Sequence, residues 1–514
     1  MLSLWATLVT VLALYQIAKI IYRIFLHPLA KFPGPKIAAA TRWYEAYYDL
    51  RPHRPGTFFL ELKRLHKIYG HIVRINPEEL HVDDPEWIDV LYVTPARGIR
   101  DKYTPAALMA GAPGSGFGTS LHDVHRKRRA SISPLFSKAA AASSTDLIYK
   151  NVLTMLQNVR KQIKHQGYAE IQVNWLTMNC DSLTDSFLGK GMGLLRDEKL
   201  AQAWAETVNA VATGTPFSKQ FPWFIPLASK LPIWVLERLT PELSKLLKVR
   251  KDMLEQATEA VAFHSQHVGV SKGARPTHEL YRTILSFSGL SEQEKRPERI
   301  SQEGFVVLVA GSDTTARILT NGVFFVLSDK TKITPRLYDE LLQAMPTLDS
   351  RPSLQKLEKL PWLTAVIKET MRLSALQTSR LSVVSPRDDL HYQEWAIPAG
   401  SAVGMTLRDI LLDPEIFEDP EAFRPERWLS DNPSLDRINR YFLPFGRGSR
   451  MCLGLNTAWV TLYIGFAVFF RHTDFVLHDT LYERDVKVVR DCFTGKASDH
   501  SKGVRIKHVS ADPM

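Results

Sequence analysis

A glycine- and arginine-rich segment near the C-terminus presents a single cysteine. The segment FGRGSRMCLG runs from Phe445 to Gly454, and its glycines allow the backbone to turn back tightly. Arg450 and the backbone N–H groups of such a turn supply positive potential, which favours the thiolate form of Cys452. A lone buried cysteine is usually a small apolar filler. Because this one lies in a charged turn ahead of an apolar segment, Leu455 to Phe470, we interpret it as a candidate metal ligand.

The other two cysteines, Cys180 and Cys492, lie far from Cys452 in the sequence. Three separated cysteines, without a CxxC pattern or a cysteine–histidine cluster, exclude a disulfide framework and a zinc site of the common spacing. The sequence therefore predicts a protein whose folded part lies in a reducing compartment.

An acid and an alcohol interrupt a long apolar stretch. The stretch from Ser301 to Ser328 is apolar enough for a buried helix, yet its middle reads AGSDTT, from Ala310 to Thr315. Glycine costs a helix interior about 1 kcal/mol relative to alanine, and Asp and Thr are also poor helix formers. Threonine hydroxyls can bond back to carbonyls of the preceding turn and bend the helix. The pattern predicts a groove that holds a small ligand beside Asp313 and Thr314, with a polar kink satisfied by its neighbours as the alternative.

Two further motifs bring charges close to apolar positions. Glu369 and Arg372 lie three residues apart, so a helix places them on one face. On its own this is a surface pair worth about 0.2–0.5 kcal/mol. Further on, Arg427 lies beside the aromatic Trp428 in the segment FRPERW.

The elements that must position these residues are mainly helical. Short β signals occur at His71 to Ile75, at Leu80 to Asp83 and within Trp395 to Gly404. Two segments read as loops near a functional site: Gly111 to His122 is glycine-rich, and Thr215 to Trp234 is apolar, aromatic and broken by prolines. The alternative for each is an ordinary surface loop. We therefore predict a mainly α fold with small β-sheets.

The composition fits one large globular body. The chain has 514 residues, of which 45% are hydrophobic and 23% charged, so it is neither mostly disordered nor a polytopic membrane protein. Residues 37–514 contain no internal repeat or flexible linker, so we interpret them as one domain. The formal charge of +11 suits an anionic membrane surface or an acidic protein partner. No long basic run interleaved with aromatic residues supports nucleic-acid binding.

Residues 1–27 form a candidate membrane anchor. The run from Leu2 to Phe25 is mainly apolar, and about 20 apolar residues at 1.5 Å each cross a hydrocarbon core of about 30 Å. A cleaved signal peptide is the alternative, but no basic region precedes the apolar run. The nearby basic residues all follow the start of the span: Lys19, Arg23, Lys31 and Lys36. The positive-inside rule therefore places the rest of the chain in the cytosol.

Residues 28–36, PLAKFPGPK, separate the anchor from the body. Pro28, Pro33 and Pro35 deny this segment a helix, and Gly34 permits a sharp turn. The composition predicts a semi-rigid connector that holds the body close to the bilayer. In a eukaryotic cell the predicted location is the endoplasmic-reticulum membrane, with a single span and the body facing the cytosol.

Together these motifs resemble those of the cytochrome P-450 superfamily, the heme-thiolate monooxygenases. The segment FGRGSRMCLG is similar to that family's heme-binding pattern FxxGxRxCxG, and AGSDTT is similar to its oxygen-binding helix motif. Glu369, Arg372 and Arg427 resemble its Glu-Arg-Arg triad, in the expected order ahead of the cysteine turn. The anchor and connector look like those of microsomal members. Residues 70–92 and 125–137 look like fungal enzymes of secondary metabolism, including trichodiene oxygenase.

The resemblance implies a cytochrome P-450 fold and a role for each matching residue. Cys452 would be the axial ligand of heme b, and Asp313 and Thr314 would deliver protons for dioxygen activation. The family's usual WxxxR appears here as His125-x-x-x-Arg129, which implies a propionate site with His125 in place of tryptophan.

The remaining implied residues bind the cofactor or support the fold. Arg450 would pair with a heme propionate, as would Arg380, which follows the Glu-x-x-Arg helix, and Phe445 begins the heme-binding pattern. The three members of the triad would be structural, because losing one of them strands a buried charge: Glu369, Arg372 and Arg427.

The implied activity is insertion of one oxygen atom from O2 into a lipophilic small molecule such as a terpenoid, polyketide or alkaloid. No convincing GxGxxG-type dinucleotide site occurs, so NADPH electrons would come through a separate NADPH-cytochrome reductase, with cytochrome b5 as an optional second donor. Two alternatives stay open: oxygen-independent rearrangement or dehydration by a heme-thiolate enzyme, and a membrane-anchored heme sensor or carrier. Retention of Asp313 and Thr314 favours the monooxygenase over both.

Overall fold

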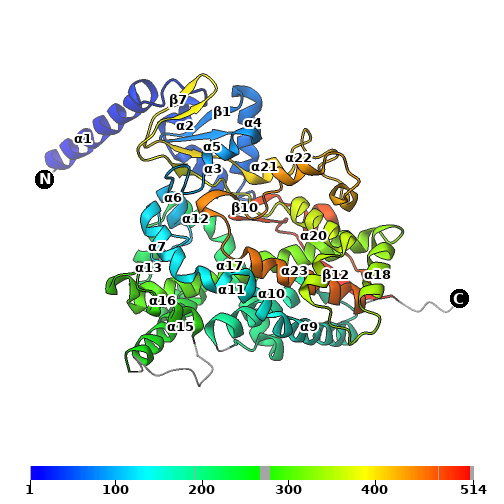
Figure 1. The fold of residues 1–514 in the computed structure, drawn as a ribbon. Helices are drawn as coiled ribbons and strands as arrows, with labels where there is room; N and C mark the ends of the chain where they lie inside the picture. Colours follow the sequence, from blue (N-terminus) through cyan, green and yellow to red (C-terminus); the bar gives the residue numbers. More distant parts are fainter. Residues whose placement is uncertain (1, 190, 267–277, 473, 510–514) are drawn as a thin grey trace.

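The computed structural model describes residues 2–189, 191–266, 278–472 and 474–509. Helices make up most of the fold, and the largest sheet lies toward the end from which the N-terminal helix projects (Figure 1). This architecture confirms the predicted mainly α fold with small β-sheets. The principal helices are α4 Phe58–Tyr69, α7 His122–Ile132, α9 Thr145–Gln166, α10 Ile171–Leu183, α11 Glu198–Thr213, α15 Pro241–Gln266, α17 Pro297–Ser328, α18 Ile333–Ala344, α20 Pro361–Ser374 and α23 Leu455–His472.

Helix α17 crosses the body and carries the acid and the alcohol. It has 32 residues, which corresponds to about 48 Å, and it packs against α10, α15, α20 and α23. Most of its residues are buried, because apolar side chains occur all round the helix rather than on one face. Pro297 lies in the first turn, where its missing N–H group is not needed. The buried helix predicted over Ser301 to Ser328 is present and begins four residues earlier.

The five-stranded sheet has the order β1-β2-β8-β5-β3. Antiparallel pairing of the first two strands gives the hairpin expected from the sequence. Parallel pairing of β2 with β8 joins the N-terminal hairpin to a segment close to the cysteine turn in the sequence. The strands are β1 Ile72–Asn76, β2 Glu79–Val82, β8 Ala402–Gly404, β5 Val383–Val384 and β3 Asp101–Lys102.

The segment from Trp395 to Gly404 supplies strands to two different sheets. Strand β7 (Trp395–Ile397) pairs with β6 (Leu390–Tyr392), whereas β8 pairs with β2 and β5. Gly400, with φ at +81°, turns the chain between them. Another two-stranded hairpin, β10 (Arg490–Cys492) with β11 (Thr494–Lys496), places Phe493 at its tip.

The segment predicted as a loop from Thr215 to Trp234 is largely helical, so that prediction is wrong in its secondary structure. It forms α12 (Thr215–Gln220), α13 (Phe224–Ala228) and the start of α14 (Ile233–Leu239). Pro216 and Pro226 lie in the first turns of α12 and α13, and Pro232 lies directly before α14, so none of the three removes an intrahelical hydrogen bond. Pro222 lies between α12 and α13. The glycine-rich segment from Gly111 to His122 is irregular until α7 begins at His122.

The N-terminal helix α1 (Leu2–Ile21) projects away from the body (Figure 1). With the π-helical turn η1 (Tyr22–Leu26) it gives a 23-residue span, Leu4–Leu26, of mean hydropathy 1.8. None of its most apolar window is buried in the body. The span is long and apolar enough to cross a membrane, and it is a candidate anchor.

The junction between this helix and the body is held by specific contacts. The Arg23 guanidinium donates to the Glu78 carboxylate at 3.1 Å, and Arg74 donates to the Arg23 carbonyl at 2.8 Å. In the connector, the Phe32 ring lies 4.9 Å from the Trp395 ring, centroid to centroid. The connector is therefore packed against the body rather than free.

Candidate functional site

The cysteine turn is built around two glycines with positive φ. Gly446 (φ +75°) and Gly448 (φ +76°) lie in a region that other residues rarely adopt. A Cβ at Gly448 would also approach the Tyr92 carbonyl oxygen to 2.6 Å. The Cys452 amide donates to the Phe445 carbonyl at 2.8 Å, which closes the turn and points the cysteine into a cavity.

The pKa of Cys452 differs from the sequence-based expectation that the turn would favour its thiolate form. Cys452 is exposed to the cavity, yet desolvation by the surrounding protein raises the pKa of its thiol, and the Gly454 amide and Arg129 offset this only in part. Arg450, which was expected to favour the thiolate, is not among the groups that shift the pKa of Cys452. Deprotonation of Cys452 therefore depends on a bound metal, which removes the proton of a coordinating thiol.

The cavity that contains Cys452, which we call the cysteine cavity, measures about 390 Å³. Among the described residues, six basic side chains line it: Lys102, His125, Arg129, Arg380, Arg447 and Arg450. Lys102, Arg129 and Arg450 donate to backbone carbonyls, and within the described ranges none has a carboxylate within 4 Å. Burial and these three positive charges lower the pKa of His125 to about 2, so its imidazole is neutral at physiological pH.

These cations show that the residues present fit the heme that the sequence resemblance implies. Burial lowers the pKa of Arg450 to about 10 and holds that of Lys102 well below its usual range. Lys102, Arg129 and Arg450 are half-buried, and cations withdrawn from water without a carboxylate partner are destabilising unless an anion neutralises them. A flat apolar group with two carboxylates matches both the cavity and its charge. The sequence analysis missed Lys102, because it lies on the edge strand β3 without any local motif.

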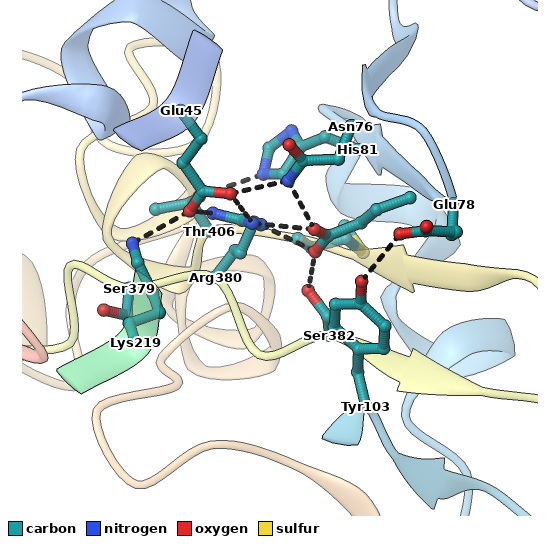
Figure 2. A network of polar contacts seen from close by, with 12 residues as sticks. Glu45, Asn76, Glu78, His81, Tyr103, Lys219, Ser379, Arg380, Ser382 and Thr406 are labelled. Atoms are coloured by element: carbon teal, nitrogen blue, oxygen red, sulfur yellow. Dashed lines mark hydrogen bonds and ion pairs between the residues drawn. The ribbon is translucent and has the colours of Figure 1, made fainter. Parts of the chain in front are cut away.

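Arg380 lies on the cavity wall but serves other carboxylates. Its guanidinium donates twice to Glu45 (2.9 and 2.9 Å), which lies beside it in Figure 2. It also donates twice to Glu79 (2.6 and 2.7 Å). These pairs outweigh burial and hold the pKa of Arg380 well above its ordinary value. All four of these hydrogen bonds go to carboxylates of the protein itself.

The acid and the alcohol of α17 lie on the wall of a second cavity. Thr314 Oγ1 donates to the Ala310 carbonyl at 2.9 Å, the back-bonding anticipated from the sequence. Gly311 does not face an open groove, because a Cβ at this position would lie 2.5 Å from the side chain of Leu183 in α10. Asp313 forms an ion pair of 2.8 Å with Arg317, one turn along the helix. The sequence analysis missed Arg317, although its i+4 spacing was a usable signal.

This second cavity, the apolar cavity, measures about 330 Å³ and adjoins the cysteine cavity through a shared wall. Asp313 is its one charged lining residue among the described ones, and most of the rest are aliphatic or aromatic. Helix α12 contributes Phe217 and Ser218, and α13 contributes Phe224 and Ile225. These two helices form a roof segment, which here means residues 215–228.

Glu369 is the centre of a fully buried charge cluster. Its carboxylate accepts from Arg372 at 2.8 and 2.9 Å and from Arg427 at 3.0 Å. Trp428 Nε1 and the Arg424 amide donate to the same carboxylate, each at 2.9 Å. The surface pair considered for Glu369 and Arg372 is thus a buried cluster that joins α20 to the segment ahead of the cysteine turn.

A helical body, a cysteine presented by a glycine turn, and cations suited to a dianionic planar group define a heme-thiolate protein. The family model described as Cytochrome P-450 matches residues 48–485. The chain belongs to the cytochrome P-450 family. It is a heme-binding monooxygenase that receives its electrons from a redox partner reductase.

The full-length relatives are fungal enzymes. The chain is 35% identical to tryptophan 6-hydroxylase of Fusarium equiseti over 500 residues, covering 97% of this chain and 95% of the relative. It is 32% identical to N-acetyltryptophan 6-hydroxylase of Emericella nidulans, with 98% and 97% covered. It is 36% identical to fusicoccadiene C-8 hydroxylase of Phomopsis amygdali, with 88% and 86% covered. These similarities support a monooxygenase of fungal secondary metabolism.

Proposed function

We propose that this enzyme hydroxylates a neutral, largely hydrocarbon small molecule held in the apolar cavity. The observation that carries this proposal is the lining, in which Asp313 is the one charged side chain and is already paired with Arg317. A free amino acid would bring two charges into this cavity without partners, which is unfavourable. The likeness to the fusicoccadiene hydroxylase, whose name refers to a diene, therefore suits the cavity better than the likeness to the tryptophan hydroxylases.

The cofactor-binding roles belong to the residues around the cysteine cavity. Cys452 is the proposed iron ligand, and its backbone amide donates a hydrogen bond to the Phe445 carbonyl. Lys102, Arg129 and Arg450 neutralise the propionates, and His125, neutral here, donates a hydrogen bond to one of them. Arg380 stays a weaker prediction, because its guanidinium already makes four bonds to Glu45 and Glu79.

The catalytic roles belong to Asp313 and Thr314. When bound, the heme-thiolate group supplies dioxygen activation with electrons from NADPH. Thr314 presents a hydroxyl at the boundary of the two cavities, since it lines both. Asp313 would pass protons to this hydroxyl, and Arg317 positions the Asp313 carboxylate and keeps it ionised. Glu369, Arg372 and Arg427 keep the structural role proposed from the sequence.

The proposed location is the endoplasmic-reticulum membrane, with residues 1–27 as a single span, residues 28–36 as a connector and residues 37–514 facing the cytosol. The basic residues after the span support this orientation. Cytochrome b5 remains a proposed second electron donor. The matching test is glycosylation mapping of sites engineered at the N-terminus and in the body: a cytosolic body stays unglycosylated.

The decisive experiment reconstitutes the full chain with NADPH-cytochrome reductase. A neutral terpenoid hydrocarbon, tryptophan and N-acetyltryptophan are compared by heme difference spectra and by product formation per NADPH. We expect a spectral shift and hydroxylated product with the hydrocarbon only. Substrate-independent spectra and no NADPH consumption would favour a heme sensor or carrier, and product formation without O2 uptake would favour a rearrangement. The metabolite that accumulates on gene deletion identifies the natural substrate.

A further inference from the structure

Helix α12 has two faces with different tasks. Phe217 and Ser218 line the apolar cavity, whereas the next two residues, Lys219 and Gln220, contact the N-terminal part of the body. The helix has only six residues and no side-chain cap at its N-terminus. A helix of this length is not stable on its own. Contacts to other elements must therefore hold this part of the roof segment over the cavity.

Lys219 supplies the strongest of these contacts. Its ammonium group lies 2.9 Å from Glu45 Oε1 and 2.7 Å from Asp49 Oδ2, and both carboxylates belong to α3 (Trp43–Leu50). Gln220 Nε2 donates to the same Asp49 oxygen at 2.8 Å. Figure 2 shows Lys219 reaching from its helix toward Glu45. The exposed fraction of the three charged side chains is 13% for Lys219, 5% for Glu45 and 1% for Asp49.

Further contacts fix the carboxylates that bind Lys219. Glu45 also accepts from Asn76 of β1 at 2.5 Å and from Arg380 (Figure 2). Arg380 in turn binds Glu79 of β2. The carboxylates that hold Lys219 are thus fixed to the five-stranded sheet and not to a mobile surface helix. Separating Lys219 from them would leave buried carboxylates with fewer cations, which is strongly unfavourable.

We infer that Lys219 is a positioning residue that latches the roof segment of the apolar cavity to α3. Opening of the roof then requires the two ion pairs to part, so Lys219 controls how often a large ligand can enter or leave. The inference rests on the proposed function only in taking the apolar cavity as the substrate site. The alternative is that an aromatic contact holds the same helix in place: the rings of Trp43 and Phe221 have centroids 6.1 Å apart.

The first test measures amide hydrogen exchange of residues 215–221 in the full chain. Lys219→Met is expected to speed exchange there at least about 100-fold, because removing one partner of a buried pair lowers the local opening free energy. Lys219→Arg keeps the charge and should retain slow exchange. The matched control is Lys245→Met, which breaks an exposed pair with Glu206. Unchanged exchange in Lys219→Met, with fast exchange in Trp43→Ala, would overturn the latch in favour of the aromatic contact.

A double variant separates the latch from a general loss of stability. Lys219→Met combined with Asp49→Asn removes one cation and one carboxylate together, so thermal stability should recover while exchange at residues 215–221 stays fast. Slow exchange in the double variant would show that the single variant merely stranded a charge, and the inference would fail.

The second readout uses two ligands of the heme iron, the small imidazole and the bulky econazole. In Lys219→Met the association rate of econazole should rise at least about threefold, while that of imidazole stays unchanged. Equal changes for both ligands would contradict a roof latch. If the wild-type chain lacked a thiolate–carbon monoxide spectrum, the proposed function would fail on its own, and the exchange result would still test the latch.

Discussion

Asp313 and Arg317 form a buried ion pair one helical turn apart, with Asp313 Oδ2 lying 2.8 Å from Arg317 Nε. Burial by itself would raise the pKa of Asp313, but Arg317 and Lys496 outweigh it and hold this pKa below its ordinary value. Arg317 also donates to the Gly495 carbonyl of β11 at 2.7 Å. The carboxylate on the cavity wall is therefore ionised at neutral pH and fixed to the C-terminal hairpin.

Removing this partner should make the reaction depend on pH. In Arg317→Met the pKa of Asp313 should rise, because burial is then opposed by Lys496 alone. The carboxylate is then protonated at a higher pH than in wild type, so product formed per NADPH should start to change at a higher pH in the variant as the pH is lowered. Loss of the pair also costs about 3–5 kcal/mol of stability. Identical pH profiles for Arg317→Met, Arg317→Lys and wild type would show that Arg317 does not control the protonation of Asp313.

Thr314→Ala should uncouple the reaction rather than stop it. A positioned proton-transfer group contributes about 10²–10⁴-fold, so product per NADPH should fall at least about tenfold while hydrogen peroxide rises. Ser312→Ala is the control on the same helix, since Ser312 Oγ donates to the Leu308 carbonyl and does not line either cavity. Unchanged coupling would leave Asp313 or Thr315 as the proton carrier.

Cys452→Ser should abolish the red-shifted carbon monoxide spectrum of the ferrous protein, because an alcohol does not replace a thiolate ligand. Cys180→Ala and Cys492→Ser should retain that spectrum, since neither thiol lies in the cysteine cavity. A thiolate spectrum that survives in Cys452→Ser would disprove the ligand assignment.

Lys102→Met tests the cation cluster. If Lys102 neutralises a propionate, heme transfer from the variant to apomyoglobin should be at least about tenfold faster, in line with the loss of one buried charge pair. Lys102→Arg preserves the charge and should stay close to wild type, as should Lys67→Met on the exposed end of α4. A normal rate of heme release in Lys102→Met would mean that its ammonium group serves only the Phe117 carbonyl that it contacts at 3.0 Å.

The roof segment and the start of α14 that follows it also predict a second membrane contact, because their aromatic residues divide between two environments. Trp223 and Trp234 are exposed to 59% and 66%, whereas Phe224 lines the apolar cavity. A chain starting at Lys31 should still co-sediment with anionic liposomes, and Trp223→Ser with Trp234→Ser should lower its binding at least about tenfold. Phe224→Ser should leave liposome binding unchanged and weaken substrate binding. Equal binding by the double variant would confine membrane attachment to residues 1–27.

Local motifs made much of this site predictable, and long-range contacts did not. Cys452 and Thr314 were found because the turn and the interrupted helix violate local preferences in recognisable ways. Lys102 and Lys219 lie in segments with no such signal, and their importance comes from partners far away in the sequence. The helices between Thr215 and Trp234 were missed, because the prolines were taken as helix breakers although Pro216 and Pro226 lie in first turns and Pro232 lies directly before one. The raised pKa of Cys452 required knowledge of burial, which a single segment does not reveal.

The contact between Arg23 and Glu78 couples the orientation of the N-terminal helix to that of the body. A helix joined by a free tether would let the body tumble at the bilayer, but a helix bonded to the turn of the β1–β2 hairpin and to Arg74 of β1 would transmit its own tilt to the rest of the chain. With the candidate span Leu4–Leu26 in a bilayer, the angle at which it crosses the lipid would decide which side of the enzyme faces the bilayer. A bilayer of different thickness, which changes that tilt, would turn the whole enzyme with it.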